Sequence, residues 1–176
     1  MALFVLAATL AQTATPQTAA ALGVRRNQTG RSSMQKGNAI TLKYQHDHIE
    51  DAVIIYQSGK CIVYLVADEA EHPDAFVKLE FERAQCIRSA ATDCSPAIGI
   101  YPEKMGVSFI VELTNSNWPV EASQKYTYAG SGLKPREHHY VVSNHDVFHE
   151  ILANSFSESL VEQGSPEYGV VKYHFQ

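Results

Sequence analysis

Hydrophobic and polar residues alternate in several short segments along this chain. The clearest segment is Phe76–Glu82, in which Val77, Leu79 and Phe81 alternate with charged residues. A period of two predicts a β-strand with one buried side and one solvent-facing side. Further strands are predicted at residues 39–45, 53–57, 60–67, 84–88, 97–101, 107–114 and 139–143, with residues 126–128 as a shorter candidate. Ser58 and Gly59 separate two of these runs and suit the tight reversal of an antiparallel hairpin.

A different spacing near the end of the chain predicts one amphipathic helix over about residues 144–163. Apolar residues recur there at intervals of three and four, which is typical of a helix with one buried face. They are Phe148, Ile151, Leu152, Phe156 and Leu160. Gly164 and Pro166 follow and are expected to end the helix. Residues 170–175 are predicted to form a final strand. We therefore expect an α+β fold, mainly an antiparallel β-sheet with one helix packed on it.

Residues 115–137 are rich in Asn, Ser, Gly and Pro, and they are expected to hold the longest irregular connection. Trp118 lies at its start, next to a proline. It is interpreted as a core residue at the end of a strand, with a ligand-binding aromatic as the alternative.

Residues 1–38 differ from the rest and are predicted to be a disordered extension or a targeting segment, followed by a single domain over residues 39–176. The apolar run at residues 2–11 has the length of a signal-peptide core, but no basic residue precedes it. A second hypothesis is that this segment is an organelle transit peptide. A third hypothesis, which we favour, is that translation starts at Met34.

Charge is distributed unevenly along the chain. Through His46 there are five basic residues and no acidic ones, whereas the remainder has a formal charge of −10. An acidic body repels phosphate backbones, so nucleic-acid binding is not expected. It suits a basic protein partner. The alternative is that the excess acid only keeps a small domain soluble. No apolar run is long enough for an ordinary membrane span.

The three cysteines, Cys61, Cys86 and Cys94, form an odd and unpatterned set. Cys86 and Cys94 flank a short polar segment and can close a small ring in an oxidising compartment. Cys61 lies in an apolar run and is expected to be a buried thiol. The odd number favours a reducing cytoplasm over export by a signal peptide around residues 1–11.

His145 and His149 are the sharpest candidates for a metal site. Two histidines four residues apart on a helix can share a zinc ion, and Asp146 follows the first as an acid does in zinc proteases. This aspartate is one methylene shorter than the glutamate of those enzymes. The alternative is that both histidines only pack or cap the helix. Additional candidate ligands are His139, His46 and His48.

No nucleophile elbow, phosphate-binding loop, dinucleotide fingerprint or CxxC pair occurs in the sequence. The absence of these motifs favours a protein that is not an enzyme. No catalytic residue and no cofactor are therefore predicted, apart from zinc in the alternative.

Three segments together resemble a loose group of uncharacterised small bacterial α+β proteins. They are VKLEFER at residues 77–83, FIVELTNSNW at 109–118, and HYVVSNHD at 139–146 leading into EILANSF at 150–156. The resemblance implies a single-domain cytosolic protein that begins near its first strand, and it carries over no catalytic residue.

The expected function is a non-enzymatic binding or accessory module, of the immunity-protein kind, whose acidic face meets a basic protein partner. The alternative is a metal-dependent hydrolase that uses His145 and His149.

Overall fold

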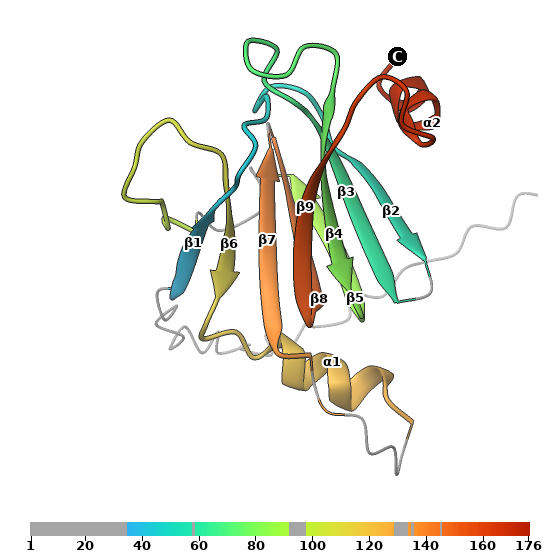
Figure 1. The fold of residues 1–176 in the computed structure, drawn as a ribbon. Helices are drawn as coiled ribbons and strands as arrows, with labels where there is room; N and C mark the ends of the chain where they lie inside the picture. Colours follow the sequence, from blue (N-terminus) through green and yellow to red (C-terminus); the bar gives the residue numbers. More distant parts are fainter. Residues whose placement is uncertain (1–34, 58, 92–97, 129–133, 135, 145) are drawn as a thin grey trace, which may run out of the picture. The chain divides into compact units, whose positions relative to one another are not determined.

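The computed structural model describes residues 35–57, 59–91, 98–128, 134, 136–144 and 146–176, all within one compact unit, Met34–Gln176. These residues form nine strands and two short helices (Figure 1). The strands are β1 (Gly37–Thr41), β2 (Val53–Gln57), β3 (Lys60–Val66), β4 (Phe76–Glu82), β5 (Cys86–Ala91), β6 (Phe109–Leu113), β7 (His138–Asn144), β8 (Val147–Ala153) and β9 (Ser155–Val161). The helices are α1 (Trp118–Tyr126) and α2 (Tyr168–His174). Neither of these helices is long and apolar enough to cross a membrane.

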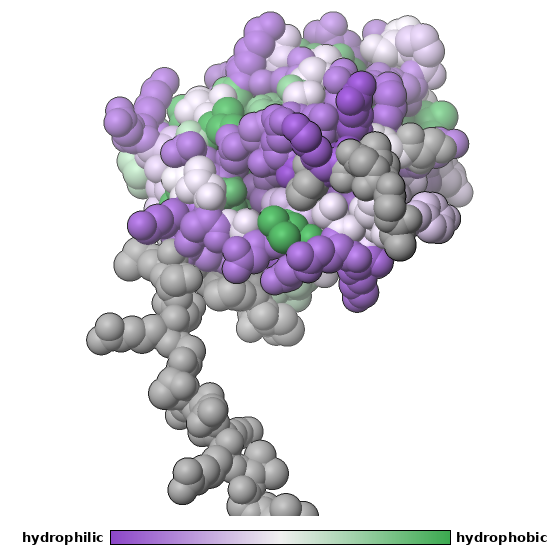
Figure 2. Space-filling model, turned by 90° about the horizontal axis from the view of Figure 1, so that it is seen from below, coloured by the Kyte–Doolittle hydropathy of each residue, from purple (hydrophilic) through white to green (hydrophobic). Residues whose placement is uncertain are grey.

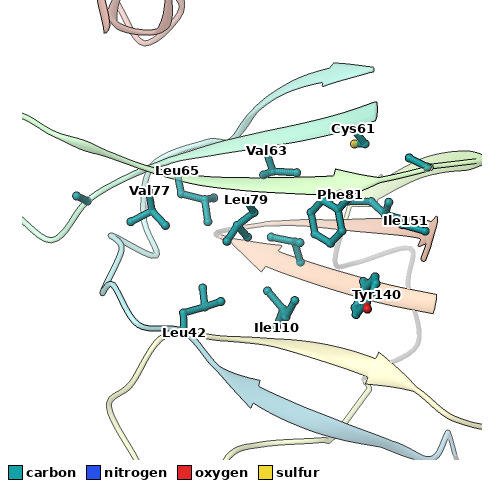
Figure 3. Packing of buried hydrophobic residues seen from close by; sticks show 14 of the residues in the cluster. Leu42, Cys61, Val63, Leu65, Val77, Leu79, Phe81, Ile110, Tyr140 and Ile151 are labelled. Carbon is teal, nitrogen blue, oxygen red and sulfur yellow. The ribbon is translucent and has the colours of Figure 1, made fainter. Parts of the chain in front are cut away.

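The strands make two antiparallel sheets. One has five strands in the order β1-β6-β7-β8-β5, and the other has four in the order β2-β3-β4-β9. Alternate side chains of both sheets point into the space between them and form the main core (Figure 3). Its members include Leu42, Cys61, Val63, Leu65, Val77, Leu79, Phe81, Ile110, Tyr140, Val142 and Ile151. Such a layer of interdigitating apolar side chains is the usual core of two packed sheets.

The outer faces of the sheets are covered differently. Helix α2 lies on the four-stranded sheet, where Val171 packs with Tyr64 and Phe76. The rings of Phe76 and Phe175 are stacked, with centroids 5.1 Å apart. On the five-stranded sheet, a smaller cluster includes Val111, Val141 and Phe148, together with residues of the 98–100 segment. Helix α1 lies at one end of the strands, at the bottom of Figure 1.

The predicted mainly antiparallel α+β fold is confirmed, but the single helix over residues 144–163 is wrong. Those residues form β8 and β9, which belong to different sheets and are joined at Asn154. The predicted final strand at 170–175 is also wrong, because that segment lies in α2 and its end. A single sheet was expected, and there are two.

Other predicted elements agree more closely. Strand β4 has the predicted bounds, and β2 pairs with β3 as the predicted hairpin. The connection at 115–137, which was expected to be irregular, contains helix α1. The short strand candidate at 126–128 begins with Tyr126, which is the last residue of this helix. Residues 98–101 are not a strand. An extension was expected over residues 1–38. Residues 1–34 of it lie outside the described residues.

Candidate functional site

Seven acidic residues belong to two loops at one end of the sheets, and these loops are at the top of Figure 1. We call this surface the acidic end; its residues are Asp47, Glu50, Asp51, Asp68, Glu69, Glu71 and Asp74. The first three follow β1 and the others lie between β3 and β4. Backbone hydrogen bonds join the two loops, from Asp47 N–H to the Val66 carbonyl (2.8 Å) and from Asp68 N–H to the Gln45 carbonyl (3.0 Å). The two acid-rich loops are thus held side by side by the backbone itself.

Local turns also fix individual carboxylates of the acidic end. Oδ1 of Asp47 accepts the Ile49 N–H at 2.7 Å, and Oδ1 of Asp68 accepts the Ala70 N–H at 2.9 Å. These are the side-chain-to-backbone bonds by which aspartate stabilises turns. Asn144 adds a link from the strands, since its Nδ2 donates to the Glu50 carbonyl at 2.6 Å.

A pocket of about 350 Å³ opens at the acidic end. Its charged lining consists of Asp47, Glu50, Glu69, Asp74 and Lys172, a net charge of −3. Phe76 and Phe175 supply aromatic surface in the same pocket. The Lys172 ammonium donates a hydrogen bond to Oδ1 of Asp74 at 2.8 Å, and this hydrogen bond lowers the pKa of the Asp74 carboxyl. An acidic rim around apolar surface can accept the head and the stem of a basic side chain.

A second hollow, a cleft of about 660 Å³, lies between α1 and β5. It is lined by Tyr56, Gln85, Cys86, Ile87, Arg88, Trp118, Glu121, Ala122, Lys125 and Tyr126. The face seen from this end is mainly hydrophilic, with isolated hydrophobic areas (Figure 2). Burial raises the pKa of the Cys86 thiol, so that it is not an activated nucleophile.

Beside this cleft, Glu150 is the centre of an ion network on the outer face of the five-stranded sheet. Its carboxylate accepts two hydrogen bonds from Arg88, from Nε at 2.9 Å and from Nη2 at 2.6 Å. Nε2 of His139 lies 2.7 Å from Glu150 Oε2. Partial burial alone would raise the pKa of Glu150, but the contacts with His139 and Arg88 outweigh it and lower the pKa to about 2.

The network continues to the start of α1. Nδ1 of His139 lies 2.7 Å from Ser116 Oγ. The guanidinium carbon of Arg88 lies 4.2 Å from the centre of the Trp118 ring, a cation–π contact. Trp118 is partly buried between Arg88 and His139, whose ring meets it edge-on at 4.9 Å. It therefore fastens α1 to the sheet and also lines the cleft.

A nucleophilic triad could be composed of residues of the same types as Ser116, His139 and Glu150, and these three lie within contact distance in series. Two features favour a structural role. Ser116 Oγ accepts the backbone N–H of Trp118 at 3.1 Å, and Ser116 is not part of the lining of the cleft. We interpret these contacts as polar interactions that hold the start of α1 against β7.

Of the two predicted metal ligands, the structure describes only His149. His145 lies outside the described residues. His149 is buried in strand β8, where its Nδ1 lies 2.8 Å from Ser89 Oγ and burial lowers its pKa. The helical spacing assumed for the pair is wrong, since the described residues on either side of position 145 belong to strands β7 and β8. The zinc site itself stays a prediction.

The additional candidate ligands do not join His149 in one cluster. His139 belongs to the Glu150 network. His46 and His48 lie at the acidic end with ring centroids 4.4 Å apart, and burial lowers the pKa of His46 to about 4. Within the described ranges, no group of three or more His, Cys, Asp or Glu side chains is placed to hold a metal ion.

The acidic composition is visible in the sequence, but the acidic end as a surface was not predicted. The signal was present in two short runs, HDHIED at 46–51 and DEAEHPD at 68–74. The contact of Arg88 with Glu150 was not predicted, because it depends on the register of β5 against β8.

A comparison with protein-family models, curated proteins and solved structures finds no match to this chain. The resemblance to small bacterial proteins therefore stays a prediction.

Proposed function

We propose that the protein is a non-enzymatic binding or accessory module, of the immunity-protein kind, that binds a basic protein partner at its acidic end. The observation that carries the proposal is the joining of two acid-rich loops by backbone hydrogen bonds around one carboxylate-lined pocket. The proposal includes no nucleic-acid ligand, since the same carboxylates repel phosphates.

Electrostatics and preorganisation both support this choice of partner. Clustered charge of one sign raises the rate at which an oppositely charged protein associates. Because the loops are already ordered, little conformational entropy is lost when a partner binds. We expect a Lys or Arg side chain of the partner to lay its stem along Phe175 and to direct its head to Glu50 and Glu69, which line the same pocket.

Among the described residues, Cys61 and Cys86 form no disulfide with each other, which suits a reducing compartment. They support the cytoplasmic location that is part of the proposal. Cys94 lies outside the described residues. The alternative, a zinc hydrolase that uses His145 and His149, has no observation in its favour among the described residues.

The experiment measures binding of the full chain to a synthetic peptide that alternates Lys or Arg with apolar residues, using an acidic peptide of the same length as the negative control. Isothermal titration is run at ionic strengths of about 0.01 M and about 0.15 M, between which screening of exposed charges changes strongly. We expect binding of the basic peptide that weakens at the higher ionic strength.

Variants locate the binding surface. The double variant Glu50→Gln and Glu69→Gln should weaken binding about tenfold, as expected for the loss of about 1.4 kcal/mol from two exposed charge contacts. The matched control is Glu121→Gln with Glu137→Gln, which changes the net charge equally; Glu121 is in α1 and Glu137 directly precedes β7. Helix α1 and the start of β7 lie at the end of the sheets away from the acidic loops (Figure 1). Equal weakening by both doubles, or no binding by the wild type, would overturn the proposal.

A further inference from the structure

The pocket at the acidic end contains a cation that belongs to the chain itself. Lys172 of α2 lines the pocket together with Asp74, and its ammonium donates a hydrogen bond to Oδ1 of Asp74 at 2.8 Å. The same ammonium donates to the Tyr168 hydroxyl at 3.1 Å and lies 5.4 Å from the centre of the Tyr168 ring. A carboxylate and an aromatic ring are the contacts expected for a bound lysine head. Lys172 therefore makes, within the chain, the kind of contact that the proposed function requires from a partner.

The contact between Lys172 and Asp74 is exposed enough to open. Their side chains are 39% and 47% exposed, and ion pairs at such exposure are only marginally stable. Helix α2 does not depend on this contact for its position, because Val171 is buried in the cluster on the sheet and Phe175, at the end of the helix, stacks on Phe76. The lysine head can therefore leave Asp74 while the helix stays on the sheet.

Asp74 stays oriented when the lysine head leaves. Its second carboxylate oxygen, Oδ2, accepts a hydrogen bond from Nε2 of Gln163 at 2.7 Å. The pocket is lined by four acidic side chains and by Lys172, so without the lysine head the charge of the lining changes from −3 to −4. Oδ1 of Asp74 then becomes available to a cation from outside the chain.

We infer that Lys172 is an internal competitor at the acidic end, which occupies the Asp74 carboxylate until a basic side chain of the partner displaces it. The inference rests on the proposed function and names a contact that limits the affinity of that site. The hydrogen bond to Asp74 raises the pKa of Lys172 above its ordinary value, so the ammonium is charged at neutral pH and the competition persists there. Removal of the lysine head should therefore strengthen partner binding, whereas loss of a purely structural ion pair would leave the affinity unchanged or lower it.

Isothermal titration of the full chain with the basic peptide described above tests the inference. The ionic strength is about 0.1 M, at which exposed charges more than about 10 Å apart are largely screened from each other. Lys172→Met should strengthen binding about two- to fivefold, the range that corresponds to an exposed ion pair. Adding Asp74→Asn removes the freed carboxylate, returns the charge of the lining to −3 and should cancel the gain.

Lys60→Met is the matched control. Lys60 forms an exposed ion pair with Glu80 at 2.6 Å, so this variant makes the same side-chain change, removes the same charge and also frees a carboxylate. Lys60 begins β3, whose last residue, Val66, lines the pocket. Six residue steps of about 3.3 Å place it roughly 20 Å from that end of the strand. Its replacement should leave the affinity for the peptide unchanged.

The outcomes separate this inference from the proposed function. If the wild type binds the peptide and Lys172→Met binds it equally or more weakly, the inference fails and the proposed function stands. An equal gain in Lys60→Met would also overturn the inference, because net charge alone would then explain it, and so would a gain that survives the addition of Asp74→Asn. Absence of binding by the wild type and by Lys172→Met alike would overturn the proposed function and this inference with it.

Discussion

Replacing Glu150 by glutamine is expected to destabilise the protein substantially at neutral pH. Two hydrogen bonds from Arg88 and the contact with His139 lower the pKa of this carboxyl from 4.5 to about 2. Each pKa unit corresponds to about 1.4 kcal/mol, so the shift corresponds to roughly 3 kcal/mol. The Glu150 side chain is 21% exposed but that of Arg88 is 53% exposed, so solvent screening reduces the expected loss to about 2 kcal/mol.

The pH dependence of the loss has a definite sign. The pKa of Glu150 is lower in the folded chain than in the unfolded chain, so ionisation favours folding at high pH. The stabilisation is complete above the unfolded value of 4.5 and is lost as the pH falls toward about 2. The wild type and Glu150→Gln should therefore differ most at neutral pH and converge in acid.

The assay is urea unfolding of both proteins at about pH 7 and about pH 3, where the ionisation contribution falls to less than half. Glu162→Gln is the matched control, because Glu162 is exposed at the end of β9 and its replacement should change stability little. If Glu150→Gln unfolds at the same urea concentration as the wild type at neutral pH, or if the difference persists undiminished in acid, the reasoning is refuted.

Three further predictions follow from the packing. Gly37→Ala should be destabilising, because a Cβ there would overlap the Glu112 backbone carbonyl, whereas Gly169→Ala in α2 meets no atom and should be neutral or stabilising in thermal unfolding. Phe81→Ala should cost about 3–5 kcal/mol in urea unfolding, since the ring is fully buried in the main core. A thiol reagent followed by peptide mapping should label Cys86 in the folded protein but not Cys61, which is fully buried and whose pKa is raised by burial to about 12. Labelling of Cys61 at the same rate would contradict the packing described here.

The success of the strand predictions follows from the surroundings of each strand. Strand β4 has Val77, Leu79 and Phe81 in the core and charged residues on its other side, so its alternation is visible in the sequence. The hairpin of β2 and β3 is marked by the short connection between them. Where one side of a strand is apolar and the other polar, the pattern of residues is sufficient.

The false helix over residues 144–163 has a physical explanation. Strand β8 lies between β7 and β5 and is buried on both faces, so Ile151 and Leu152 point to opposite sides yet are both apolar. A strand buried on both faces shows no alternation. The chain then changes sheets at Asn154, and Phe156 and Leu160 alternate with serines in β9. The two patterns together imitate the spacing of a helix.

The sites could be predicted only in part. Acidic runs at 46–51 and 68–74 are visible in the sequence, but their contact depends on the pairing of His46 with Ala67. That contact joins segments about twenty residues apart, and local patterns do not reveal it. The meeting of Arg88 with Glu150 depends in the same way on how β5 aligns with β8.

A heteronuclear NMR titration of the full chain with the basic peptide would locate the binding surface residue by residue. If the acidic end binds, the largest shifts should fall on residues 46–51 and 66–75, with smaller ones at Phe175. Shifts centred instead on α1 and β5, around Trp118, or no shifts at all, would contradict the proposed function.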